Sequence, residues 1–278
     1  MNMKRSSRGS LIIIATATLL GVATPVAAQT APSLGTAQSY AVLGGSTVTN
    51  TGPSVIGGDL GLSPGTAVTG FPPGAVVGGA IHAADGPALS AQNSLTTAYN
   101  SLVSQACTQD LTGQDLGGKT LTPGVYCFST SAGLTGSLTL NAQGNAAAVF
   151  IFKMGSTLTT ASGSSVVMTN GGSQCNVFWQ VGSSATVGTS TAFAGNILAL
   201  TSISVTTSAN VIGRTLARNG AVTLDSNNIT PTTCAAAPAP VPGPTLPEAF
   251  LLIMALGLAG VGYLRLRPTA AARQGAVH

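Results

Sequence analysis

The chain has 278 residues, of which only 6% are charged and 4% are aromatic, whereas 36 residues are glycine. Soluble domains usually carry about 25% charged residues, so Ser, Thr, Asn and Gln must make this surface polar. The formal net charge of +4 comes from the two ends, because residues 29–237 hold four cations and five anions. The basic balance therefore gives no indication of a nucleic-acid partner.

The N-terminus has the layout of an export signal. Three basic residues among the first eight precede an apolar run over 11–22, and small residues lead up to Ala28. This pattern predicts a secretory signal peptide over 1–28, cleaved after Ala28. A short membrane anchor is the alternative. The signal peptide places the remaining domain, residues 29–234, outside the cytoplasm.

One segment of this domain has the pattern of a helix. Residues 87–107 place apolar side chains on one stripe: Leu89, Leu95, Tyr99, Leu102 and Cys107. Asp85 and Gly86 precede Pro87, which suits a helix start. We expect this helix to pack against a larger body.

Nearly all the rest reads as short strands separated by Gly, Ser and Asn. A polar–aliphatic–polar triplet recurs in these strands. Its aliphatic centres are Val48, Leu140, Leu158, Val187, Val205 and Leu224. From Leu140 onwards the centres are 18, 29, 18 and 19 residues apart. A period near 20 favours a solenoid of stacked coils over a β-sandwich, and the 29-residue coil leaves room for a loop around 168–174.

Four segments resemble a known family, the microbial ice-binding-protein-like domain. They are LGTAQSYAVLGGSTVTNTGPSVIGGDLGLSPG, DLGGKTLTPGVYCFS, NVFWQVGSSATVGTSTAFAGNILAL and GRTLARNGAVTLDSN, and the resemblance runs from about Ser33 to Thr230. It implies a mainly β fold: an irregular right-handed β-solenoid (β-helix) of triangular cross-section with one long α-helix packed alongside. It also implies binding to ice crystals.

Side chains alternate sides along a strand, so both neighbours of an inward aliphatic centre point outward. This alternation predicts two outward rows on one flat face. The first row is Thr47, Thr139, Thr157, Thr186, Ser204 and Thr223. The second row is Thr49, Asn141, Thr159, Gly188, Thr206 and Asp225. Three further threonines, Thr160, Thr189 and Thr207, extend the predicted ice-binding face into the following turns.

A rigid threonine grid suits ice because each side chain offers a methyl group and a hydroxyl and has few rotamers to lose on docking. Gly188 and Asp225 interrupt the second row, and Asn141 and Ser204 dilute the array. The alternative is that these threonines are ordinary strand surface. The domain would then be a structural or adhesive module of the cell surface, an adhesin that binds a matrix polymer or another protein.

The sequence offers little for catalysis or nucleotide binding. GQDLGGKT (113–120) matches a phosphate-binding loop, but Pro123 and Gly124 follow where that loop needs a helix, so we expect a turn that enters a strand. His82 is interpreted as a solvated turn residue and Trp179 as core. Asp110 and Asp115 give weak support for acid–base chemistry. We therefore expect no catalytic residue, no cofactor, no metal and no nucleotide, although a polysaccharide-active enzyme is a minor alternative.

Four cysteines lie in the exported part: Cys107, Cys127, Cys175 and Cys234. An even number in an oxidising compartment predicts two disulfides. Of the three pairings we favour Cys107–Cys127 with Cys175–Cys234, mainly because the first pair is close in sequence. None of the spacings is that of a zinc knuckle.

The C-terminus is set apart from the domain. Residues 235–247 form an Ala/Pro-rich linker, and the tail 248–278 contains 16 residues without a charge (249–264) followed by Arg265 and Arg267. The uncharged run spans about 24 Å as a helix, slightly short for a free-standing transmembrane helix. The layout resembles the sorting tails recognised by exosortase-type enzymes, with an ordinary tail anchor as the alternative. Both predict attachment to the membrane or cell envelope.

Overall fold

The computed structural model describes residues 29–232. The predicted signal peptide (1–28), linker (235–247) and tail (248–278) lie outside the described residues. Within the described part, no helix is both long and apolar enough to span a membrane. The described residues 29–232 have their own apolar core, so we expect them to fold without residues 235–278.

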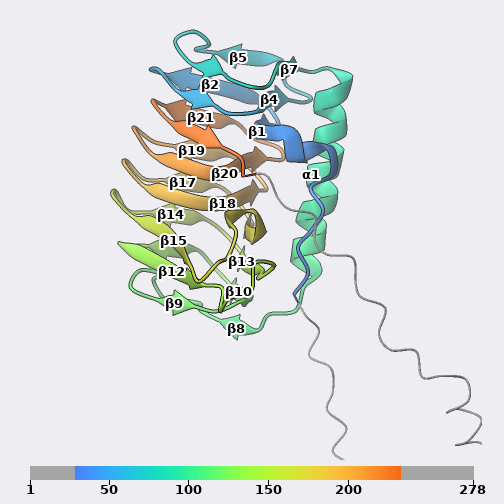
Figure 1. The fold of residues 1–278 in the computed structure, drawn as a ribbon. Coiled ribbons are helices and arrows are strands. Elements are labelled where there is room, and N and C mark those ends of the chain that lie inside the picture. The colour runs from blue at the N-terminus through green and yellow to red at the C-terminus, as the bar shows by residue number, and fades with distance from the viewer. Residues whose placement is uncertain (1–28, 233–278) are drawn as a thin grey trace, which may run out of the picture. The chain divides into compact units, whose positions relative to one another are not determined.

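Short parallel strands stack into a β-solenoid, and a single α-helix runs along its side (Figure 1). Two sheets make up the solenoid, one of 15 strands and one of 7 strands. The larger sheet covers two faces because two of its strands turn a corner. The solenoid therefore has three faces, which we name the helix face, the hydroxyl face and the open face.

The helix face is the part of the larger sheet that α1 covers. In stacking order its strands are β8 (Gln109–Asp110), β10 (Gly124–Phe128), β13 (Phe150–Met154), β16 (Val177–Val181), the second halves of β18 (Ala192–Ala199) and β20 (Asn210–Ala217), β1 (Tyr40–Gly44), β4 (Asp59–Leu62) and β7 (Ile81–Ala83). Strands such as β1 and β16 are buried along their whole length, because the helix covers the side that faces away from the core.

The hydroxyl face is the seven-stranded sheet. Its strands, in stacking order, are β11 (Ala132–Leu134), β14 (Leu158–Thr160), β17 (Ala185–Val187), β19 (Ile203–Val205), β21 (Val222–Asp225), β2 (Thr47–Thr51) and β5 (Ala67–Thr69).

The open face is the rest of the larger sheet. Its strands are β9 (Thr120–Leu121), β12 (Ser137–Asn141), β15 (Ser165–Thr169), the first halves of β18 and β20, β22 (Asn228–Thr230), β3 (Val55–Ile56) and β6 (Ala75–Val76). Two 3₁₀ turns, η1 (Gly35–Ser39) and η2 (Gln174–Asn176), complete the fold, and η2 closes the loop predicted around 168–174.

Two glycines allow β18 and β20 to turn from the open face to the helix face. Gly195 and Gly213 are partners in the ladder, with φ of 110° and 147°. A Cβ on Gly213 would lie 2.0 Å from the carbonyl oxygen of Gly195. Both the positive φ and the close approach therefore require glycine.

The order of the coils in space differs from their order in the chain. The first strand, β1, pairs with β20 on one side and with β4 on the other, so the N-terminal coil lies next to the C-terminal coil. The helix makes this possible because it carries the chain to the opposite end of the stack. Its 19 residues span about 28 Å, which matches about 29 Å for the six strand spacings from β4 to β10.

Helix α1 (Gly86–Ser104) confirms the predicted helix but ends three residues before Cys107. Asp85 caps it through a hydrogen bond of 2.9 Å from the Ala88 amide to Oδ1. The buried stripe consists of Ala88, Ala91, Gln92, Leu95, Ala98, Tyr99 and Leu102. The prediction that Leu89 belongs to it is wrong, since Leu89 is 54% exposed. The small alanines let the helix approach the sheet closely, and they define the stripe better than the largest apolar residues do.

The core between the three faces is apolar and contains an aromatic stack. The Trp179 ring lies 4.1 Å from that of Phe152 and 4.9 Å from that of Phe193, measured between centroids. Trp179 is fully buried and donates through Nε1 to the carbonyl oxygen of Ala194 at 3.0 Å. The prediction that Trp179 is a core residue is confirmed.

The disulfide Cys107–Cys127 is also confirmed, and it fastens the segment after α1 to β10. Cys175 is buried, whereas its predicted partner Cys234 lies outside the described residues, so that pairing stays a prediction. The segment 113–120 enters β9 and then β10, which confirms the predicted turn into a strand.

Candidate functional site

A straight row of hydroxyl side chains runs along the centre of the hydroxyl face. The ladder register aligns Thr159, Thr186, Ser204, Thr223, Thr49 and Thr69 across six neighbouring strands. All six residues are exposed or half-buried. We call them the central row; its five strand spacings make it about 24 Å long.

The local sequence explains why these side chains point outward. In β19 the residues on either side of Ser204, Ile203 and Val205, are 0% and 1% exposed. In β21 Val222 and Leu224 flank Thr223 in the same way, both fully buried. The period-two alternation of a strand therefore places every central-row residue on the outer side of the sheet.

Two neighbouring side chains of the central row, those of Thr49 and Thr223, are hydrogen-bonded to each other. Thr49 Oγ1 donates to Thr223 Oγ1 at 3.3 Å, across the contact between the first and the last coil of the chain. In the described residues no charged side chain belongs to this row.

The structure corrects the register of the two predicted rows. Leu158 pairs with Ala185, so Thr159 rather than Thr157 lies beside Thr186. In the same way Thr49, not Thr47, lies beside Thr223. The reason is that β17 and β21 each have two buried residues, one on either side of the outward threonine. Leu158 and Val48 pair with the first of these, Ala185 and Val222, whereas the triplet centres Val187 and Leu224 are the second.

Thr47 and Thr157 are not lost from the hydroxyl face, because each lies two residues before a central-row residue in the same coil. Both are half-buried at the edge of the face. Thr157 Oγ1 donates to Ser131 Oγ at 2.8 Å, while Thr47 pairs with Ala67. They lie in a row that flanks the central row, where Ser131 and Ala67 occupy the positions next to the two threonines.

Thr139 and Asn141 are on a different face, and their predicted position is wrong. They belong to β12, which pairs with β9 and β15 on the open face. Asn141 Oδ1 accepts hydrogen bonds from the Gln143 amide at 2.9 Å and from Asn170 Nδ2 at 2.8 Å. Every face has the same in-and-out alternation, so a polar–aliphatic–polar triplet does not indicate which face it occupies.

The prediction that Thr160 is exposed is also wrong, since it is 3% exposed. Its Oγ1 accepts a hydrogen bond from the Gly188 amide at 2.8 Å and lies 3.1 Å from Thr191 Oγ1. Thr160 thus braces the corner between two coils.

The other edge of the hydroxyl face carries a network of hydroxyls. Thr189 and Thr207 are exposed in the turns, and Thr189 Oγ1 lies 3.3 Å from Thr206 Oγ1. Thr206 Oγ1 also donates to the Val187 carbonyl oxygen at 2.9 Å, and Thr207 donates to Asp225 Oδ2 at 2.5 Å. The hydroxyls of Thr206 and Thr207 therefore donate to groups outside the central row, to the Val187 carbonyl oxygen and to Asp225.

Sequence reasoning missed Thr69, which extends the central row into β5. The signal was present as Val68-Thr69, an aliphatic centre followed by threonine. It was overlooked because Ala67 replaces the first polar residue of the triplet.

Two carboxylates, those of Asp110 and Asp115, accept hydrogen bonds from groups in nearby turns. Asp115 bridges to Gly133 at the end of the sheet, and its Oδ1 accepts from the amides of Gly117 at 2.7 Å and Thr135 at 3.0 Å. Burial raises the pKa of Asp115, but these hydrogen bonds outweigh it and the pKa is lowered overall. Asp110 has a lowered pKa because the hydroxyl and the amide of Thr112 donate to it.

His82 differs from its prediction as a solvated turn residue. It lies in β7, half-buried, with Nδ1 2.7 Å from Asp85 Oδ2 at the start of α1. Among residues 29–232, no three His, Cys, Asp or Glu side chains come close enough together to hold a metal ion.

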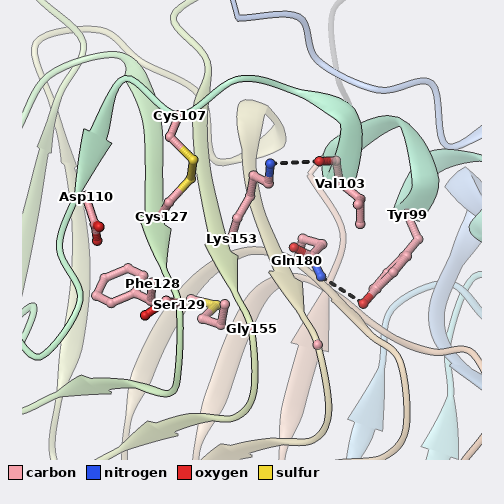
Figure 2. A pocket seen from close by; sticks show the side chains of 12 residues that line it. Tyr99, Val103, Cys107, Asp110, Cys127, Phe128, Ser129, Lys153, Gly155 and Gln180 are labelled. Carbon is pink, nitrogen blue, oxygen red and sulfur yellow. Dashed lines mark hydrogen bonds between the residues drawn. A yellow bond between two sulfur atoms is a disulfide. The ribbon is translucent and has the colours of Figure 1, made fainter.

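A groove of about 540 Å³ lies between the end of α1 and strands β10, β13 and β16, next to the Cys107–Cys127 disulfide (Figure 2). Its polar groups are engaged with the protein. Lys153 Nζ donates to the carbonyl oxygens of Val103 at 2.8 Å and Gln105 at 2.6 Å, and burial lowers its pKa. Gln180 Nε2 donates to the Tyr99 hydroxyl at 2.8 Å. These bonds hold the helix end in place.

The exposed central row and the groove with its engaged polar groups define a β-solenoid that presents an uncharged row of hydroxyls on one sheet. The chain belongs to the Ice-binding-like family, whose model matches residues 42–230.

Individual relatives agree with this assignment. An ice-binding protein from Nostoc sp. (strain HG1) is 56% identical over 228 residues, which cover 82% of this chain and 84% of the relative. An ice-binding protein from Flavobacterium frigoris is 32% identical over 71% of this chain and 75% of its own length. Among solved structures, an ice-binding protein from the Antarctic ascomycete Antarctomyces psychrotrophicus superposes with a TM-score of 0.72. It has 41% identity and covers 74% of this chain and 100% of that one.

Proposed function

We propose that this protein binds ice crystals through the hydroxyl face and thereby slows ice growth or recrystallisation. The observation that carries the proposal is the central row, a straight and uncharged line of five threonines and one serine. Family membership supports the same ligand, because the relatives described above are ice-binding proteins.

The chemistry of the row suits a lattice of water. Coils repeat at about 4.8 Å, so hydroxyls and methyls recur at one spacing along the row. The β-branched side chains have few rotamers, and little entropy is lost when they order water. The hydroxyls form hydrogen bonds to the ordered layer of water, and the methyl groups limit its extent. A lysine would compete through its own strong hydration shell, and none lies on the row.

Adsorption of many rigid molecules accounts for the effect on growth. Each adsorbed protein blocks the crystal locally, so the ice front advances between molecules and becomes curved. A curved front grows less favourably than a flat one. The proposed contact set is the central row, with Thr47 and Thr157 on one flank and Thr189, Thr206 and Thr207 on the other. No reaction or cofactor is part of this proposal.

Ice-recrystallisation inhibition by residues 29–237 tests the proposal. Thr159→Tyr places a bulky ring at one end of the central row and Thr186→Tyr places one at the next position, and each should strongly weaken inhibition. Thr97→Tyr is the matched control, because Thr97 is exposed on α1, away from the hydroxyl face. If the unmodified domain leaves ice grain growth unchanged, the structural or adhesive alternative gains instead.

We further propose that the domain is exported and attached to the cell surface. The sequence of residues 1–28 supports cleavage of a signal peptide, and the sequence of 235–278 supports a linker and an envelope or membrane anchor. N-terminal sequencing of the mature protein should begin at Gln29. A mature chain that retains residues 1–28 contradicts export by cleavage.

A further inference from the structure

The open face carries a second set of outward rows. One row is unbroken in the ladder across seven strands: Ser137, Ser165, Ala192, Asn210, Asn228, Val55 and Ala75. The other has two runs: Thr120, Thr139 and Val167, then Ile212 and Thr230 beside the buried Ala194. Neither row contains a charged or aromatic side chain.

This face also exposes aliphatic side chains. Seven large apolar residues of the described chain are substantially exposed, and four of them lie on or directly beside this face. They are Val55 at 41%, Val77 at 55%, Val167 at 41% and Ile212 at 46%. Their spread over the coils makes a sheet surface of methyl groups, hydroxyls and amides. Four exposed aliphatic side chains on a face without charged side chains mark it as a candidate binding surface.

Several kinds of ligand fit poorly. Eight strands of two outward residues give a face of about 34 by 10 Å, so a stable protein partner, which buries about 800 Å² of accessible surface on each side, would have to extend well beyond this face. Sugar polymers stack on aromatic rings, which these rows lack. A polyanion or anionic membrane requires lysines or arginines, which are also absent from the rows.

An ordered layer of water fits better. The same coils build the hydroxyl face and the open face, so both faces repeat at about 4.8 Å along the solenoid. The methyl groups of Val and Ile can confine a layer of water, and the Asn and Thr side chains beside them can form hydrogen bonds to it. The two faces are neighbours, since short turns such as 161–164 and 206–209 connect their strands in each coil.

The corner between the two faces is held by buried hydrogen bonds. Asn227, 2% exposed, donates through Nδ2 to the carbonyl oxygens of Thr206 at 2.8 Å and Ala209 at 3.0 Å. In another coil, Thr191 is fully buried and bonds the hydroxyl of Thr160 at 3.1 Å. These contacts fix the orientation of one face to the other.

We propose that the open face is a second ice-contacting surface, so that the molecule engages two differently oriented planes of a crystal, one with each face. The proposal rests on the ice-binding function proposed above. It assigns a role to Thr139, Val167 and Ile212, which the hydroxyl face does not include.

The test is ice-plane affinity: a single crystal is grown in residues 29–237 labelled at the N-terminal amine, and the labelled planes are mapped by fluorescence. The double variant Val167→Lys/Ile212→Lys introduces two strongly hydrated charges on the open face. Leu89→Lys is the control, because Leu89 is 54% exposed on α1. Thermal unfolding of each variant verifies that it is folded.

We expect the wild type to label more than one class of plane. Val167→Lys/Ile212→Lys should lose one class and keep the other, Thr186→Tyr should show the reverse loss, and the combined variant should bind no plane. Leu89→Lys should match the wild type. The second surface is overturned if Thr186→Tyr alone loses all labelling and Val167→Lys/Ile212→Lys labels the same planes as the wild type. That result leaves the proposed function intact. If the wild type labels no plane, both the second surface and the proposed ice-binding function are overturned. If the wild type forms a concentration-dependent dimer that Val167→Lys/Ile212→Lys abolishes, the open face serves self-association and the second ice-contacting surface is overturned.

Discussion

Replacing Asn227 should destabilise the solenoid more than its small side chain suggests. Asn227 is 2% exposed and lies in the turn between β21 and β22. Its Nδ2 donates to the carbonyl oxygens of Thr206 at 2.8 Å and Ala209 at 3.0 Å. Its Oδ1 accepts from the Asp225 amide at 2.6 Å. One side chain therefore joins two neighbouring coils at the corner between the hydroxyl face and the open face.

The magnitude follows from these three bonds. Each buried hydrogen bond contributes about 1 kcal/mol net, so Asn227→Ala should lower the free energy of unfolding by about 3 kcal/mol. For a domain of this size 1 kcal/mol corresponds to about 2–4 °C, so Tm should fall by about 6–12 °C.

Chemical denaturation of residues 29–237, followed by circular dichroism, measures this loss. Asn228→Ala is the matched control, because Asn228 is the exposed neighbour and a surface change of this kind stays within about 0.5 kcal/mol. Equal losses for Asn227→Ala and Asn228→Ala would refute the idea that the corner depends on this buried amide.

Three further changes test other parts of the fold. Gly213→Ala should unfold or severely destabilise the domain, because its Cβ would lie 2.0 Å from the Gly195 carbonyl oxygen. Gly118→Ala is the control, since Gly118 also has a positive φ but lies in open space. It should lower the free energy of unfolding by only about 1 kcal/mol in the same denaturation experiment. Cys107→Ser/Cys127→Ser opens a loop with a sequence separation of 20 and should lose about 3 kcal/mol, while ice-recrystallisation inhibition measured well below Tm persists. Asp115 has a folded pKa below its ordinary value of 3.8, so its stabilisation is present above that value and is lost as pH falls through the lowered pKa. Denaturation at a series of pH values should show a smaller acid loss in Asp115→Asn, and an unchanged acid loss contradicts this assignment.

Much of the architecture was predictable because it depends on local patterns. The alternation of polar and aliphatic residues at a period near 20 identified stacked coils, and the Asp85-Gly86-Pro87 start marked the helix. The order of the coils was not predictable from this period. The chain's first coil is inserted beside its last one, and only the length of the helix, matched to the stack, makes that connection possible.

The candidate site was predictable by composition but not by register. Hydroxyl residues flank an inward aliphatic in nearly every coil, so threonine enrichment on the outside was evident. Whether Thr157 or Thr159 lies beside Thr186 depends on how the corner turns close. Thr160 illustrates the difficulty: a threonine at the end of a strand can point inward and bond the next coil, and the sequence around it resembles that of exposed positions.

The low charge of the chain has a structural explanation. Of the nine charged residues in the described part, six lie on the helix side of the solenoid: Asp59, Asp85, Asp110, Lys153, Arg214 and Arg218. Asp115 and Lys119 lie in the terminal coil, where Asp115 bridges to the end of the hydroxyl face, and Asp225 borders that face along its edge.

Both other faces are thus almost free of charged side chains, although the coil geometry could accommodate them at any outward position. An ordinary solenoid surface gains solubility from scattered ions, so their segregation to the helix side is a cost that a purely structural role does not explain. A ligand that rejects hydrated ions on both faces explains it, and ice is such a ligand. The proposed contact of both faces with ice therefore accounts for the low charge of the chain.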